Sequence, residues 1–292
     1  MNLTHLKRKR KKMKISRRNF LKIAGLGMLF GGVPRLLGGE LEHSEKYHFW
    51  KNGKFRQTTV DTSDIDKDII RAKIGRRWRT FKVRELPDPF MEWNTRKRLE
   101  TLDNIMKEKP PELAGPHSGM VASYGVRRKD SQFTLNNAVK GIGFVPKKEF
   151  IRAKIEYMKK TYEGSMKTKL EFLRDLYKHP EILNRKLQVS LELYTTPDFE
   201  THSFLNLMAN PIATIVFLDI PSYEIRTIAR VIHPEAPDAS DYEKDCVEYT
   251  NLIHSYFHGD FSRKFIGLLF YIVEVFDNTP GKRSALGQRI IP

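Results

Sequence analysis

Five side chains with hydroxyl or imidazole groups are crowded into one short stretch of the sequence: Thr195, Thr196, Thr201, His202 and Ser203. The segment "HSFLNLMAN" that begins at His202 is predicted to form a short helix. Free backbone N–H groups at a helix start, together with neighbouring hydroxyls, can bind a phosphate group. The same residues are equally typical of a plain helix start with Thr201 as the N-cap. The sequence leaves both interpretations open.

Three other side chains are candidates for ligand binding. Arg226, on a predicted strand, either pairs with a phosphate or is an ordinary outward-facing strand residue, and its position favours the second interpretation. His254 and His258 are spaced i and i+4 on a predicted helix, which suits a pair of metal ligands. No third ligand is evident and Ser255 follows His254, so the pattern favours two surface histidines and no metal site.

Cys246 is the only cysteine in the chain. One cysteine excludes an intrachain disulfide framework, a cysteine-rich zinc site, an iron–sulfur cluster and a c-type haem attachment. Because it lies within a predicted helix, Cys246 is expected to be a small buried apolar residue. If the protein has a redox cofactor, that cofactor is held without thiolates, as a flavin or a quinone would be.

The elements around the hydroxyl-rich turn are predicted to form an antiparallel sheet. Strands are expected at residues 187–195, 212–218, 223–234 and 265–277, and a helix at 241–257. The tetrapeptide "DIPS" joins two of these strands by a tight turn, which places them antiparallel. The fold class predicted for residues 146–292 is therefore α+β, with an antiparallel meander or barrel and packed helices.

The stretch "LYTTPDFETHSFLNLMANPIATIVFLD" resembles the pyridoxamine-phosphate-oxidase-like family of FMN-binding split barrels. That family carries the pattern Ser-x-Lys-x-x-Asn-Leu-x-x-Asn-Pro, and Asn206, Leu207, Asn210 and Pro211 match its second half. The resemblance covers residues 187–279. It implies an antiparallel split β-barrel, an FMN cofactor and a homodimer with the flavin at the interface.

One departure from the family pattern bears directly on function. Thr201 stands at the Ser position, and Ser203 stands where the family has its phosphate-binding Lys. A hydroxyl offers the phosphate a hydrogen bond but no charge. Two functions therefore remain open: an FMN-dependent oxidoreductase of unknown substrate, or a flavin-less binding or assembly subunit of a membrane-associated extracytoplasmic complex. In the first, FMN would be bound by the hydroxyl-rich turn and Arg226.

Residues 40–145 are predicted to be an irregular or helical region. A short strand is expected at Trp78–Val83 and a helix at residues 94–107. The aspartates between Asp61 and Asp68 indicate a helix start capped by Ser63 or Asp64 rather than a calcium loop. Residues 113–146, punctuated by glycines, are expected to be a loop that covers a site. Two helices then follow, at residues 147–163 and 166–179.

The N-terminus, residues 1–39, carries the stretch "SRRNFLKIAGLGMLF" after a basic run. It resembles a twin-arginine export signal, which implies passage through the twin-arginine translocase to a periplasmic or other extracytoplasmic location. We expect the signal either to be cut near Gly38 or Gly39 or to stay as a membrane tether. Residues 1–37 supply 11 of the formal net charge of +17. The remaining charge is mixed, which argues against a nucleic-acid-binding protein.

Overall fold

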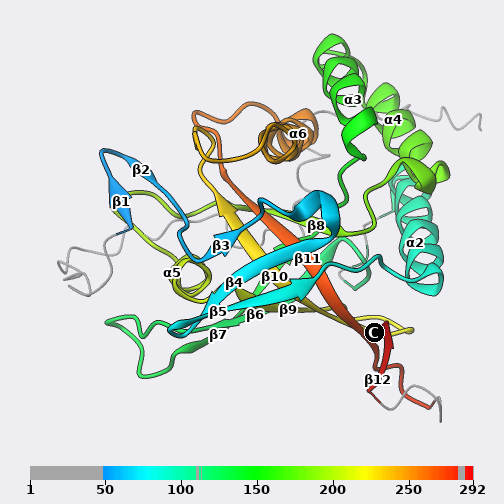
Figure 1. Cartoon of the computed structure of the whole chain (residues 1–292). Coiled ribbons are helices and arrows are strands. Elements are labelled where there is room, and N and C mark those ends of the chain that lie inside the picture. Colours follow the sequence, from blue (N-terminus) through cyan, green and yellow to red (C-terminus); the bar gives the residue numbers. More distant parts are fainter. Residues whose placement is uncertain (1–48, 110–111, 113, 282–286, 292) are drawn as a thin grey trace, which may run out of the picture.

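The computed structural model describes residues 49–109, 112, 114–281 and 287–291 (Figure 1). The predicted export signal lies outside the described residues. The described part is a mixed α+β structure with five α-helices. None of these helices is both long enough and apolar enough to span a membrane. The helices are α2 (Asp88–Met106), α3 (Lys148–Lys160), α4 (Met166–Lys178), α5 (His202–Ala209) and α6 (Asp241–His258).

A seven-stranded antiparallel sheet forms the centre of the molecule. Its order is β12-β11-β10-β9-β6-β7, and β8 pairs with β11 beside this path. The strands predicted after residue 187 are confirmed, and the "DIPS" turn joins two antiparallel neighbours, β9 and β10. The strands are β6 (Ser118–Tyr124), β7 (Leu135–Gly141), β8 (Leu187–Glu192), β9 (Ile212–Val216), β10 (Tyr223–Ile232), β11 (Ile266–Asp277) and β12 (Gln288–Ile291).

The two outer strands β7 and β8 come together at one point. Gly143, just after β7, and Val189 of β8 form an isolated bridge with two backbone hydrogen bonds of 2.9 Å. The ladders between the named strands of the described part do not otherwise join β7 to β8, so the sheet does not close into a complete barrel.

The loop predicted at residues 113–146 is wrong, because β6 and β7 form a hairpin there. Glycines are typical of loops, yet Gly119 lies within β6. A Cβ atom at Gly119 would approach Ile215 Cγ2 to 2.7 Å, so this glycine allows close packing inside the sheet. The sheet also takes strands from both sides of residue 145. The expected boundary there does not separate two sheets.

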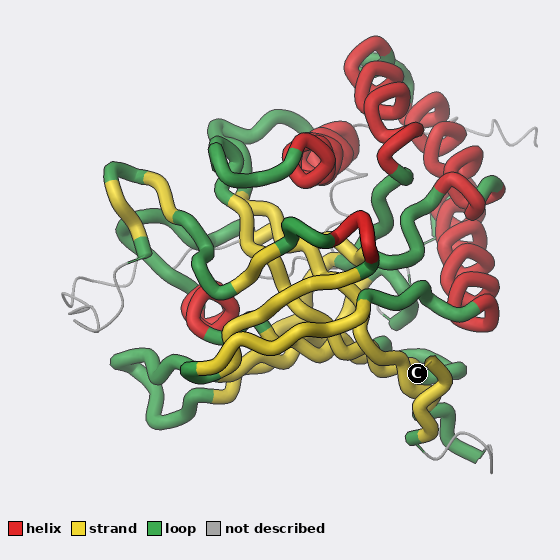
Figure 2. Tube along the Cα trace, viewed as in Figure 1, coloured by secondary structure: helices red, strands yellow, loops and turns green. Residues whose placement is uncertain are grey.

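A second, three-stranded sheet lies beside the first, in the order β3-β4-β5 (Figures 1 and 2). Its strands are β3 (Val60–Asp61), β4 (Ile69–Ile74) and β5 (Arg77–Lys82), and a two-stranded ribbon precedes them, β1 (Trp50–Lys51) with β2 (Lys54–Phe55). The strand expected at Trp78–Val83 is confirmed. The helix expected near Asp64 is only a single 3-10 turn, η2 (Ile65–Lys67). The described part of residues 40–145 contains helix α2, and in addition the strands β1 to β7, most of which the prediction of an irregular or helical region did not include.

Two apolar clusters fill the two sides of the large sheet. Ile225 and Phe270 belong to one cluster, and Ile228 and Leu269 belong to the other. Because β10 and β11 are covered on both faces, they read as nearly continuous apolar runs. Helices α3, α4 and α6 are confirmed close to their predicted positions.

Candidate functional site

The hydroxyl-rich turn is built as a helix cap. Thr201 is the N-cap of α5, and its Oγ1 accepts a hydrogen bond of 3.2 Å from the backbone N–H of Phe204. The Thr195 hydroxyl donates to Thr201 Oγ1 and accepts from the Thr201 backbone N–H, each at 3.2 Å. The capping interpretation of Thr201 is therefore confirmed.

The other residues of the turn are also engaged within the protein. Ser203 is 3% exposed, and its hydroxyl accepts a 2.9 Å hydrogen bond from the Asn136 side chain. His202 Nε2 lies 2.7 Å from the carbonyl oxygen of Val126 and donates to it. Thr196 forms a backbone bridge to Phe199. A phosphate at this turn would have to compete with these contacts.

Arg226 lies on the opposite face of the large sheet from the turn. Side chains alternate between the two faces of a strand, and Arg226 stands one position from Thr227 on β10. The ladder aligns Thr227 with Ala213, Ser123 and Asn136 on the α5 side, where Asn206 and Ser203 contact the last two. It aligns Arg226 with Thr214, Ala122 and Asn137 on the other side.

The contacts of Arg226 agree with this placement. Its Nε donates a 2.8 Å hydrogen bond to Glu224, and its guanidinium lies 4.2 Å from the Phe276 ring centroid. The structure thus brings Thr195, Thr201, His202 and Ser203 together but leaves Arg226 apart from them. Arg226 is the outward-facing strand residue that its sequence position favoured.

The histidine pair is half-buried rather than exposed. The His254 and His258 rings lie 4.8 Å apart, and His254 stacks on Phe261. Burial, with a smaller contribution from His258, lowers the pKa of His254 to about 4. Among the described residues no group of three His, Cys, Asp or Glu side chains is placed to hold a metal ion. Cys246 is fully buried, as predicted.

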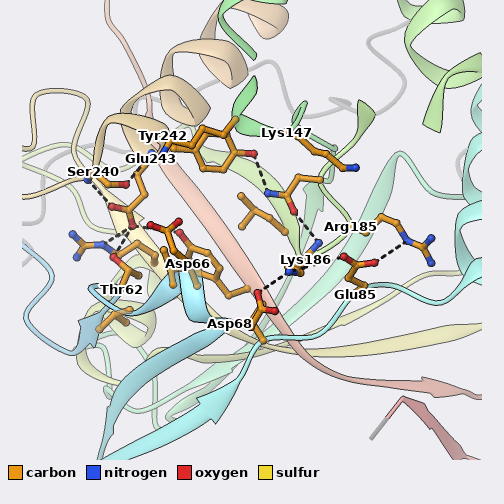
Figure 3. Close-up of a pocket in the computed structure, with 18 of the residues that line it drawn as sticks. Thr62, Asp66, Asp68, Glu85, Lys147, Arg185, Lys186, Ser240, Tyr242 and Glu243 are labelled. Carbon is orange, nitrogen blue, oxygen red and sulfur yellow. Dashed lines mark hydrogen bonds and ion pairs between the residues drawn. The ribbon is translucent and has the colours of Figure 1, made fainter. Parts of the chain in front are cut away.

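A cleft of about 1600 Å³ lies between the small sheet and the N-terminal ends of α3 and α6 (Figure 3). Eleven carboxylate side chains line it, against six Lys or Arg side chains. The whole chain carries a net positive charge. The acidic lining is therefore a local feature of this cleft, which we call the acidic cleft.

A buried charged group forms the floor of the acidic cleft. Arg230 is 4% exposed and Glu243 is 2% exposed. Arg230 Nη2 donates to Asp238 at 3.0 Å, and Nη1 donates to the Gln57 carbonyl at 3.0 Å. Arg230 Nε lies 3.5 Å from Glu243 Oε1, but it has no hydrogen-bond acceptor among the described residues. A buried donor of this kind is costly to leave unpaired.

Glu243 is held in place by the start of α6. Its side chain accepts a 2.8 Å hydrogen bond from the backbone N–H of Ser240, while the Ser240 hydroxyl accepts from the Glu243 N–H, a capping box. Thr62, at the end of β3, donates to the Glu243 carboxylate at 3.2 Å. Burial raises the pKa of Asp238, but hydrogen bonding to Arg230 and nearby positive charge outweigh it, so the net pKa is lowered.

Ion pairs line one side of the cleft, and unpaired carboxylates lie elsewhere along it. Lys186 Nζ is 2.7 Å from Asp68, and Arg185 Nη2 is 2.7 Å from Asp88. Burial raises the pKa of Tyr242, whose hydroxyl donates to the Pro146 carbonyl at 2.7 Å. The carboxylates with no ion pair to another described residue are those of Asp66, Glu92 and Glu149.

No protein-family model matches this chain, and no curated protein is similar to it in sequence. Function must therefore be argued from the geometry of the turn and of the cleft.

Sequence reasoning did not identify the acidic cleft. The aspartates near Asp66 have the pattern of a solvated helix start, and Arg230 lies within a largely apolar strand, β10. The one available signal was Arg230 itself, since a charged residue in an apolar strand is rarely buried without a partner. Its partners Asp238 and Glu243 lie just before and within α6, far along the sequence from Asp66 in η2.

Proposed function

We propose that this protein is a binding subunit whose acidic cleft holds a basic peptide segment of a partner protein. The observation that carries the proposal is the cleft itself: a space of about 1600 Å³ with an excess of carboxylates, in a chain of positive net charge. A cleft lined by one sign of charge attracts and orients ligands of the other sign.

The floor and the wall of the cleft differ in the groups that they present to a ligand. Arg230 Nε is buried in the floor, 3.5 Å from Glu243 Oε1, so the floor supplies buried charge and no free donor to a ligand. Asp66, Glu92 and Glu149 have no ion pair within the described residues, and Lys or Arg side chains would complement them. An extended basic peptide offers several such cations along its length.

The fold supports a relationship to split barrels without deciding the function. We infer that the sheet from β6 to β11 is a split barrel, because the Gly143–Val189 bridge links β7 to β8 and because β8, α5 and β9 lie within the residues that carry the sequence resemblance. One fold hosts many functions, so this inference does not by itself carry a cofactor.

An FMN-dependent oxidoreductase is the second candidate. It is favoured by the meeting of Thr195, Thr201 and Ser203 at the N-terminus of α5, where a helix start favours an anion. FMN would supply redox chemistry, and the turn would hold its phosphate. An absorbance spectrum of the protein purified from its own host tests this: a flavin spectrum supports it, and its absence removes it.

A homodimer and an extracytoplasmic location complete the proposal. Leu135 and Val139 of β7 are 65% and 71% exposed, and Tyr124 of β6 lies opposite Leu135 on the same face. We propose that a second copy of the chain covers this apolar face.

Export by the twin-arginine translocase remains a prediction, tested by replacing Arg17 and Arg18 with Lys and fractionating the cells. Unchanged export would contradict it.

Titration calorimetry of the full chain with a short Lys-rich peptide tests the cleft. We expect binding that weakens as salt rises, because salt screens exposed charges. An Asp66→Asn, Glu149→Gln variant should bind about fivefold more weakly, since each exposed ion pair contributes roughly 0.2–1 kcal/mol. A Glu-rich peptide of the same length should not bind.

A matched control separates the cleft from general charge. A Glu156→Gln, Glu171→Gln variant removes the same charge from exposed positions on α3 and α4, outside the cleft. It should bind the Lys-rich peptide as the wild type does. Equal weakening in both variants, or no binding by the wild type, would contradict the proposed function.

A further inference from the structure

The hairpin formed by β4 and β5 is strongly basic. Between Ile69 and Arg84 the sequence contains seven Lys or Arg residues and no Asp or Glu. Figure 1 shows the two strands at the front of the molecule, and β5 is the edge of its sheet. We call this segment the cationic hairpin; its cations are Arg71, Lys73, Arg76, Arg77, Arg79, Lys82 and Arg84.

Most of these cations are exposed and have no acidic partner. Arg76, Arg77, Arg79 and Lys82 are exposed, and none of them forms an ion pair with another described residue. Arg71 is the exception, with Asp61 at 3.5 Å. Lys and Arg residues elsewhere on the surface often form ion pairs with carboxylates. In the cationic hairpin most of the positive charge is available for a ligand.

An exposed aromatic ring lies among these cations. Trp78 is 44% exposed, and its ring centroid lies 5.4 Å from the Arg71 guanidinium. In the ladder Trp78 pairs with Lys73, so both side chains are on one face of the hairpin. Arg71 and Lys82 lie on the same face by alternation. One face of the hairpin therefore combines several cations with one large amphipathic ring.

We propose that the cationic hairpin docks the protein on the anionic phospholipid head groups of a bilayer. Arg and Lys near an anionic bilayer surface are attracted to it, and Arg can bind phosphate oxygens with two hydrogen bonds. Trp is favoured at the boundary between head groups and acyl chains, where its ring is apolar and its N–H stays hydrated. Trp78 also borders the acidic cleft, but none of the cations of the hairpin lines it, so the charge that would bind the bilayer lies outside the cleft.

Cosedimentation of the full chain with vesicles tests the proposal. Phosphatidylcholine vesicles with phosphatidylglycerol should bind more protein than phosphatidylcholine alone, and high salt should reduce the difference. A Lys73→Gln, Arg76→Gln, Lys82→Gln variant removes two cations from the Trp78 face and one from the connecting turn. It should lose roughly 100-fold in affinity for the anionic vesicles, at about fivefold for each charge removed. Trp78 emission should shift to the blue on binding, and Trp78→Phe should abolish that shift.

The matched control removes three exposed cations elsewhere: Lys107→Gln, Lys160→Gln, Lys178→Gln. None of these residues forms an ion pair with another described residue, and both triple variants have the same net charge. Residues 1–48 are identical in all variants, so their contribution cancels. Equal loss in both variants would overturn the proposal. It would also be overturned if the hairpin variant lost binding to single-stranded RNA but kept its binding to anionic vesicles.

Discussion

The turn before α5 and the acidic cleft both gather side chains suited to a ligand, but they differ in what those side chains already contact. At the turn, the hydroxyls of Thr195, Thr201 and Ser203 are all engaged in hydrogen bonds within the protein. At the cleft, the carboxylates of Asp66, Glu92 and Glu149 have no ion pair with another described residue.

The difference shows that residue type alone does not make a binding site. Ser, Thr and His near a helix start serve the helix first, since its initial N–H groups need acceptors. Charged side chains on opposing elements cannot all form ion pairs or hydrogen bonds with one another when a space separates them. What remains unsatisfied around that space is a better guide to a ligand.

The largest expected effect is a difference in stability between two variants of β10, one at Arg230 and one at Arg226. Arg230→Ala should lower the free energy of unfolding by about 3–5 kcal/mol, because Glu243 and Asp238 would lose their buried cation. Arg226→Ala should cost roughly 0–1 kcal/mol, because its ion pairs are half exposed. Urea denaturation followed by far-ultraviolet circular dichroism measures both. Equal losses would remove the distinction between the cleft floor and the sheet surface.

A smaller effect is expected at the turn. Thr201→Ala should cost about 1 kcal/mol of stability through loss of the N-cap, whereas Thr201→Ser should retain most of it. The same denaturation measurement applies. Neither change should alter the affinity for the Lys-rich peptide. A change in peptide affinity after Thr201→Ala would mean that the turn and the cleft are not independent.

The smallest effect concerns pH. The folded-state pKa of Asp238 lies below its ordinary value of 3.8, so its ionised form stabilises the fold above that value and this stabilisation is lost as pH falls. Stability should therefore decline on acidification through and below pH 3.8, and Asp238→Asn should decline less steeply. Thermal melts across this range measure it. Parallel curves for the two proteins would exclude Asp238 as a contributor.

Much of the fold could be predicted from the sequence where the apolar pattern was clear. The strands β10 and β11 and the helices α3, α4 and α6 follow from long apolar or periodic runs. The hairpin of β6 and β7 was missed because Gly119 serves close packing, which one sequence does not reveal. β3 and β4 were missed because they are short or interrupted by charge.

The site was harder to predict than the fold. Thr201 as a cap follows from local sequence, because the cap and its partner are three residues apart. The acidic cleft depends on Thr62, Arg230 and Glu243, which come from three elements separated by long stretches of chain. Only the tertiary structure brings these three residues together.

Hydrogen–deuterium exchange of the full chain tests the difference between the two regions most directly. Exchange is measured for the protein alone, for the protein with the Lys-rich peptide and for the protein with FMN, because a bound ligand slows local opening. The account predicts that the peptide protects residues 62–68, 147–149 and 240–243, and that neither ligand protects residues 195–206. Protection of residues 195–206 by FMN, with no protection around the cleft by the peptide, would contradict it.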